Sequence, residues 1–88
     1  MMRVLLMSDY NGWPLWTEKG ATGPDDWPTL SAELHQALQA WEDYWDINFH
    51  YTTGWSDGAK DWYVTEGLRL ASQLQAELGQ EVDVHLTP

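Results

Sequence analysis

Carboxylates and tryptophans are the side chains of this sequence whose chemistry is most distinctive. The densest acidic group consists of Glu42, Asp43 and Asp46 near the end of one predicted helix, with Asp57 and Asp61 near the start of the next. An antiparallel hairpin of these helices would bring both ends together as one negative patch. Such a patch attracts a basic partner and raises its association rate by roughly 10- to 1,000-fold at low salt. An ordinary solvated helix face is the alternative, and the net charge of −10 keeps both interpretations open.

A second acidic group combines carboxylates with large aromatic side chains. Asp25 and Asp26 lie in a segment that also contains Trp13, Trp16 and Trp27. Aromatic anchors flanked by carboxylates suit protein recognition. The alternative is that these tryptophans hold the segment against a small core, on the strand face that helices leave open.

A metal or catalytic site has little support. His50 follows Asp46 by four residues and could join Asp57 or Asp61 around a cation. However, the sequence has no His-Glu-x-x-His motif and no calcium-loop spacing, and a turn or cap role suits these residues better. There is also no glycine-rich phosphate loop and no nucleophile elbow. We therefore expect no catalytic residue, no metal ligand and no cofactor.

The charge balance restricts the partners. Fourteen acidic residues face four basic ones, namely Arg3, Lys19, Lys60 and Arg69. At least ten carboxylates therefore stay unpaired, and their field repels phosphates and anionic lipids. Free nucleic acid and membrane surfaces are poor partners, because nucleic-acid affinity depends on Lys and Arg. A basic protein is the expected partner.

Disulfides and thiolate chemistry are excluded because the chain has no cysteine. The apolar run near the start ends at Ser8-Asp9, too early for a signal peptide or a membrane span. These features lead us to expect a cytoplasmic protein. The length of 88 residues predicts a single domain over residues 1–88, since a chain of this size supports one core.

The first third of the chain predicts one strand and one long loop. Val4-Leu5-Leu6-Met7 is a short apolar run typical of a strand covered on both faces. Residues 11–28 contain three prolines and three glycines, which exclude a long regular element. We expect a loop over 11–28, packed in part by its tryptophans.

Two helices and a strand follow. The first helix should begin after an N-cap at Ser31 and end near Asp46, and Ile47–Trp55 is expected to be a connection. Ser56 or Asp57 should cap the second helix and Gly79 should end it. The predicted inner faces are Leu30, Leu34, Ala37, Leu38, Trp41, Tyr44 and Trp45 in the first helix, and Ala59, Trp62, Tyr63, Gly67, Leu70, Ala71, Leu74 and Leu78 in the second.

The last segment alternates apolar and polar residues from Val82 to Leu86, as a strand with one buried face does. Gly67, within the apolar face of the second helix, should mark close approach to another backbone. The predicted fold is an α+β two-layer domain of order strand-helix-helix-strand, in which a helical hairpin covers a two-stranded sheet. The strand pairing stays open, as does extension of the sheet by a second subunit in a homodimer.

Short runs in the first third carry a resemblance. Ser8-Asp9-Tyr10, Pro14-Leu15-Trp16 and Leu30-Ser31 at the helix start resemble a pattern in small, uncharacterised bacterial proteins. The resemblance implies no activity and assigns no functional residue. In general character, the small, acidic, cysteine-free chain with many aromatic residues also resembles immunity proteins and other inhibitors of basic nucleases or toxins.

Our leading hypothesis is an acidic binding module, not an enzyme, that inhibits a basic partner protein, in one version by imitating the charge of nucleic acid. Its candidate binding residues are Trp13, Trp16, Asp25, Asp26, Trp27, Glu42, Asp43, Asp46, Asp57 and Asp61. One alternative is a small-molecule-binding or enzymatic domain with the tryptophan-rich loop as a lid. Another is a structural subunit that associates with itself.

Overall fold

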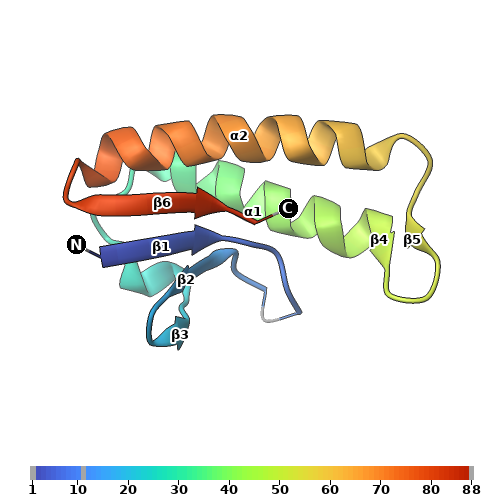
Figure 1. Ribbon diagram of the computed structural model, residues 1–88, viewed down its shortest axis with the longest axis horizontal. Helices are drawn as coiled ribbons and strands as arrows, with labels where there is room; N and C mark the ends of the chain where they lie inside the picture. Colours follow the sequence, from blue (N-terminus) through green and yellow to red (C-terminus); the bar gives the residue numbers. More distant parts are fainter. Residues whose placement is uncertain (1, 11, 88) are drawn as a thin grey trace.

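The computed structural model describes residues 2–10 and 12–87, so residue 11 at the start of the expected loop, and the two terminal residues of the expected domain, lie outside the described part (Figure 1). Its elements in chain order are β1 (Met2–Leu6), β2 (Leu15–Thr17), β3 (Gly20–Ala21), the short 3-10 helix η1 (Pro24–Asp26), α1 (Ala32–Asn48), β4 (Phe49–His50), β5 (Gly54–Trp55), α2 (Ala59–Leu78) and β6 (Val82–Leu86). The protein is an α+β domain in which the helical hairpin packs beside the sheet. No helix of the described residues is long and apolar enough to cross a membrane.

The main sheet has four strands in the order β3-β2-β1-β6, so the prediction of a two-stranded sheet was wrong. β1 and β6 are parallel, with Met2 opposite Val82 and Leu6 opposite Leu86. The helical hairpin makes the crossover between them that parallel strands need. The third and fourth strands come from residues 15–21 of the chain itself, within the segment expected to be a loop.

Prolines and glycines frame this small β2–β3 hairpin instead of preventing it. Pro14 precedes β2 and Pro24 follows β3, so neither removes a hydrogen bond from the ladder. Gly20 has a φ of +111°, a left-handed conformation that suits the tight turn. Thr17 then pairs with Gly20, and Trp16 pairs with Ala21.

One face of the sheet packs on the helices. Val4, Leu6 and Leu15 have no exposed surface and belong to the core with the inner faces of α1 and α2. Of the three tryptophans expected on the opposite face, Trp16 is half-buried beside Leu5, its register partner. Trp13 and Trp27 are instead buried in the same core as the helices.

The ends of the helices confirm some predictions and correct others. The Ser31 hydroxyl caps α1 by accepting from Leu34 N at 3.2 Å, and Gly79 ends α2 with a φ of +88°. The N-cap of α2 is Gly58, with a φ of +74°, and not Ser56 or Asp57. α1 continues two residues past Asp46, and the expected connection forms the β4–β5 hairpin.

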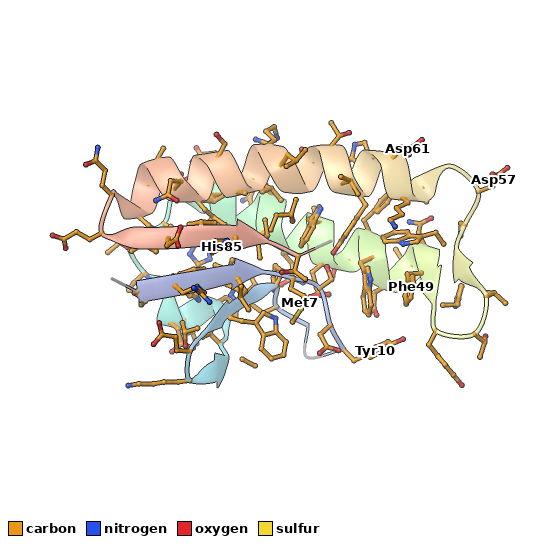
Figure 2. The ribbon with its side chains drawn as sticks, in the orientation of Figure 1. Met7, Tyr10, Phe49, Asp57, Asp61 and His85 are labelled. Carbon is orange, nitrogen blue, oxygen red and sulfur yellow. The ribbon has the colours of Figure 1, made fainter. Side chains whose placement is uncertain are left out.

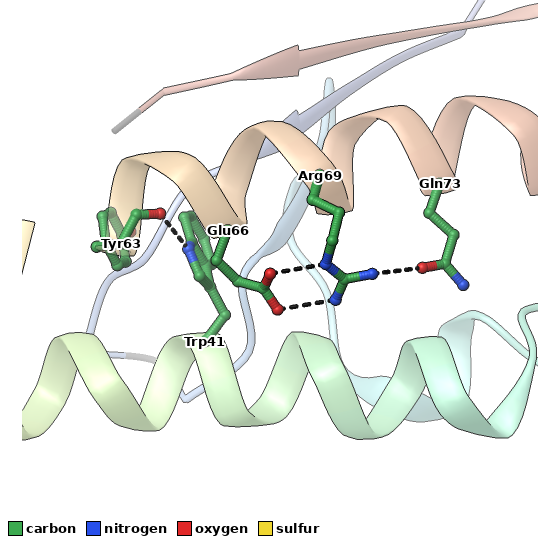
Figure 3. Close-up of polar contacts among 5 residues, drawn as sticks. All are labelled: Trp41, Tyr63, Glu66, Arg69 and Gln73. Carbon is green, nitrogen blue, oxygen red and sulfur yellow. Dashed lines mark hydrogen bonds and ion pairs between the residues drawn. The ribbon is translucent and has the colours of Figure 1, made fainter. Parts of the chain in front are cut away.

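The two helices are joined by a stacked pair of rings. Trp41 and Tyr63 are buried, their ring centroids lie 4.2 Å apart at 9°, and Trp41 Nε1 donates to the Tyr63 carbonyl at 2.8 Å (Figure 3). Gly67 leaves room for this packing, because a Cβ there would lie 3.0 Å from Trp41 and from Leu86. The close approach predicted at Gly67 therefore involves these side chains and not another backbone.

Trp62 is not a core residue, contrary to the prediction. It is 45% exposed and packs on Tyr44, with ring centroids 4.3 Å apart. Tyr63, the next residue along the helix, takes the inward position and is 1% exposed. Neighbouring residues on a helix point about 100° apart, so the true inner face runs through Tyr63, Gly67, Leu70 and Leu74.

The outer edge of β6 is covered by a side chain of α2. Gln75 Nε2 donates to the Val82 carbonyl, and Gln75 Oε1 accepts from Val84 N at 3.2 Å. One amide side chain therefore occupies two backbone groups that another strand would otherwise bond. Proteins protect edge strands in this manner because an open edge promotes pairing between chains.

Replacing Trp41 with alanine should lower the free energy of unfolding by about 3 to 5 kcal/mol, because the change leaves a large cavity between the helices. Trp62→Ala should cost about 1 kcal/mol or less, since its ring is largely at the surface. Urea denaturation followed by circular dichroism measures both values. Equal losses for the two variants would contradict the assignment of Trp41 alone to the core.

Gln75→Leu should expose the edge of β6 and cause concentration-dependent self-association, measurable by sedimentation velocity. The same change removes these two hydrogen bonds and a third from Gln75 Nε2 to the Gly79 carbonyl, and should destabilise the domain by about 1 to 3 kcal/mol. Gln73→Leu is the matched control, because Gln73 bonds only Arg69 and Glu77 on the helix surface. A Gln75→Leu variant that stays monomeric at high concentration would show that the edge needs no such cover.

Candidate protein-binding surface

A continuous chain of aromatic rings runs from the core to the surface at the β4–β5 end of the helical hairpin. Its successive ring centroids lie between 4.2 and 5.5 Å apart. The rings, in order from the inside, are those of Trp41, Tyr63, Trp55, Phe49, Trp45 and Tyr10. Aromatic contacts of this kind stabilise by about 0.5 to 1.5 kcal/mol each, so the chain gives order to this end of the molecule.

Local structure explains the middle of the chain of rings. Trp45 and Phe49 are four residues apart at the end of α1, where side chains share a face, and their rings are stacked at 5.3 Å. Phe49 is also the register partner of Trp55 in the β4–β5 hairpin. Tyr10 arrives from the segment after β1 and meets Trp45 edge to face at 5.0 Å.

Large apolar side chains are exposed beside these rings. Six large hydrophobic side chains are exposed among the described residues, and four lie at this end: Tyr10, Ile47, Tyr51 and Trp62. Tyr51, at the tip of the β4–β5 hairpin, is 84% exposed. Clusters of exposed apolar side chains mark interaction sites more often than scattered ones do.

Acidic side chains surround this aromatic cluster. Asp43 and Asp46 lie in the last turns of α1, and Asp57 and Asp61 lie at the start of α2. All four are exposed. The antiparallel helices place these two ends together, and Figure 2 shows Asp57 and Asp61 at the same end of the molecule as Phe49.

The negative charge here is compensated only in small part. Among the described residues, the Arg69–Glu66 ion pair (Figure 3) lies midway along α2, and the contact of His85 with Asp83 lies on β6. Among the basic residues, all of them described, only Lys60 belongs to this end. Asp46 also lies in the last turn of α1, where the helix dipole disfavours a negative charge by about 0.3 to 1 kcal/mol. Stability of the free domain therefore does not explain this placement.

We define the hairpin-end surface as these exposed groups. It consists of Tyr10, Ile47, Tyr51 and Trp62 with Asp43, Asp46, Asp57 and Asp61. Large apolar side chains beside carboxylates suit protein recognition, because the apolar groups can fill pockets of a partner while the charges attract its basic surface.

Glu42 differs from the other acids of the group, because it is 2% exposed and not at the surface as expected. Its Oε1 accepts from Asp9 N at 3.4 Å, and its Oε2 has no hydrogen-bond partner among the described residues. Burial, together with the nearby Asp46, Asp9 and Asp43 carboxylates, raises the pKa of Glu42 to about 7. A carboxyl group of mixed protonation at neutral pH therefore lies behind the hairpin-end surface.

The second predicted group lies elsewhere. Trp13 and Trp27 are 3% and 6% exposed, so their rings face the core and not a partner. Asp25 and Asp26 are exposed on η1, where Asp26 accepts from Gly23 N at 2.8 Å. η1 precedes α1, whereas the hairpin-end surface lies at the far end of that 17-residue helix, about 25 Å away. The structure therefore does not combine the two groups into one site.

Other kinds of site find no structural basis in the described residues. Over residues 2–10 and 12–87, no group of three or more histidine, aspartate or glutamate side chains could hold a metal ion. Two hollows lie beside Met2, one lined by residues 80–82 at the start of β6 and the other by residues 17–19 at the turn between β2 and β3, and no tryptophan lines either of them. Residues 17–19 of the segment expected to be a lid therefore line the second hollow, whereas its tryptophans line neither hollow.

The sequence interpretation missed the aromatic half of this surface. Tyr10, Ile47, Tyr51 and Trp62 were not among the candidates, although a signal existed. Residues 41–63 contain eight of the twelve aromatic residues, more than the inner faces of two helices need.

No significant match is found among curated proteins. A family model described as Serratia CdiI immunity protein-like matches residues 2–88. Because that match spans nearly the whole chain, the protein belongs to the Serratia CdiI immunity protein-like family.

Proposed function

We propose that this protein is an immunity protein that neutralises a toxin by binding it through the hairpin-end surface. The observation that carries the proposal is the meeting of exposed apolar side chains with four exposed carboxylates and a single basic residue, Lys60, at one end of the domain. Membership of an immunity-protein family supports the same reading. The role is binding and not catalysis.

The partner surface should be basic and contain an apolar pocket. The net charge of −10 and the exposed carboxylates of the hairpin-end surface favour a positively charged partner. Trp62 and Tyr10 are the side chains suited to fill the pocket, since tryptophan and tyrosine dominate interface energetics. A toxin that acts on nucleic acid has such a basic surface, and an acidic protein bound there would exclude the substrate.

We further propose that the protein acts in the cytoplasm as a monomer. The absence of cysteine suits a reducing compartment. The cover that Gln75 gives to β6 supports the monomer, because one sheet edge is occupied from within. The alternative of a ligand-binding lid is less well supported, because residues 17–19 of that segment line one hollow but its tryptophans line none.

The partner can be found by affinity capture from a lysate of the source cell. Bound proteins are eluted stepwise with salt and identified by mass spectrometry. Co-expression of the captured protein with and without this chain then tests neutralisation. We expect a basic protein at stoichiometric amount whose expression arrests growth, and rescue when this chain is present. A captured protein that is harmless alone, or toxic in both cases, would overturn the proposal.

Asp43→Lys together with Asp46→Lys should slow association with the captured partner by roughly 10-fold or more at low salt and have little effect at high salt. Surface plasmon resonance over a series of salt concentrations measures this rate. Asp25→Lys with Asp26→Lys is the matched control, because it changes the net charge by the same amount but at η1. If the η1 variant is the slower one, the partner binds the second acidic group instead.

Trp62→Ala should weaken binding to the partner by about 10- to 30-fold or more, as loss of a central aromatic anchor does. The melting temperature should change little, since the ring is 45% exposed. Isothermal titration calorimetry gives the affinity, with Leu68→Ala as control because Leu68 is also exposed on α2 but farther along the helix. Unchanged affinity for Trp62→Ala would remove this side chain from the interface.

A further inference from the structure

Glu42 is a buried ionisable group that the proposed binding role does not use directly. It lies on α1, and its Oε1 accepts from the backbone N of Asp9, the residue before Tyr10. Tyr10 in turn packs on Trp45, one turn along from Glu42 on the same helix. One side chain therefore holds the backbone that presents an exposed ring of the hairpin-end surface.

The same segment has a second attachment. Tyr63 on α2 donates its hydroxyl to Ser8 Oγ at 2.6 Å. Burial raises the pKa of Tyr63 to about 12, so this hydroxyl stays neutral over the physiological range. Ser8–Tyr10 is therefore fixed at one end by a bond that pH does not change and in the middle by Glu42.

The charged groups that act on Glu42 are all of its own sign. Asp43 and Asp46 approach from α1, and Asp9 approaches from the segment after β1. On α2 the ionisable group is the neutral Tyr63. A neutral Glu42 fits this environment, whereas a charged Glu42 leaves Oε2 buried and unpartnered among three carboxylates. The bond from Asp9 N favours the charged carboxylate, but desolvation by burial is the larger effect and the three carboxylates add to it. Burying a charge in this way is costly, so ionisation favours opening of the structure around it to water.

We propose that the protonation state of Glu42 controls the Ser8–Tyr10 segment: neutral Glu42 holds Tyr10 against Trp45, and ionised Glu42 releases it. The consequence for binding rests on the proposed function, because Tyr10 belongs to the hairpin-end surface. Release of Tyr10 would leave the aromatic anchor less ordered. The partner-binding surface would then respond to pH around neutrality.

The effect on stability follows from linkage. The pKa of Glu42 is about 7 in the folded protein and 4.5 is its ordinary value, so the folded state holds more protons between these pH values. The free energy of unfolding contributed by this group therefore falls as pH rises through that window. Glu42→Gln keeps the shape of the neutral form and should remove this fall.

The test is an NMR titration of the protein alone between pH 5 and 9. Labelled tyrosine rings report the environment of Tyr10, and hydrogen exchange of the Asp9 amide reports whether its hydrogen bond is intact. In the wild type we expect the Tyr10 ring signals and the protection of Asp9 N–H to change together with a midpoint near pH 7. Glu42→Gln should keep the low-pH signals throughout. Glu33→Gln is the control, because Glu33 is an exposed acid in the first turn of the same helix, and it should retain the transition.

A second variant guards against misfolding of Glu42→Gln. Asp9→Asn removes one of the facing carboxylates and should move the midpoint to lower pH. The proposal is overturned if the wild type shows no transition at Tyr10, if Glu42→Gln shows the same transition, or if Asp9→Asn leaves the midpoint unchanged. None of these outcomes would contradict the proposed binding of a toxin. Conversely, failure to capture a toxin would not contradict the proposed control of the Ser8–Tyr10 segment by Glu42.

Discussion

The stack of Trp41 on Tyr63 is the contact on which the rest of the fold depends. It joins the two helices at the centre of the core, and the indole N–H adds a bond to the Tyr63 carbonyl. Gly67 and Leu86 complete the packing around the indole, so the same contact places β6 beside α2. With the hairpin fixed in this way, β6 returns parallel to β1, and the C-terminal end of α1 meets the N-terminal end of α2.

The function that we propose develops from that meeting of helix ends. The stack continues outward through Trp55, Phe49 and Trp45, so order in the core extends to the surface. Around it, like charges gather where they do not benefit the free domain, with Asp46 at the unfavourable end of a helix dipole. A basic partner would supply the missing positive charge. The charge of the hairpin-end surface would therefore be balanced when a basic partner binds to it.

The sequence predicted the features that depend on local chemistry. Ser31 and Gly79 were placed correctly because caps depend on residues within one turn. The β2–β3 hairpin was missed because strands of three and two residues are too short to show a hydrophobic period, and β2 is held in place by its pairing with β1. Trp62 and Glu42 were misplaced because each lies next to a core residue on its helix, and only packing decides which of two neighbours faces inward. The candidate surface contains Asp43, Asp46, Asp57 and Asp61 of the sequence prediction, which still stands as a prediction, and it adds exposed apolar side chains that only the folded hairpin brings together.

Hydrogen-exchange mass spectrometry of the complex with the captured partner tests the central claim most directly. We expect binding to slow exchange over residues 43–62 and at the segment that presents Tyr10, with no change at η1. Slowed exchange confined to η1 or to the open face of the sheet, with the hairpin end unaffected, would contradict it.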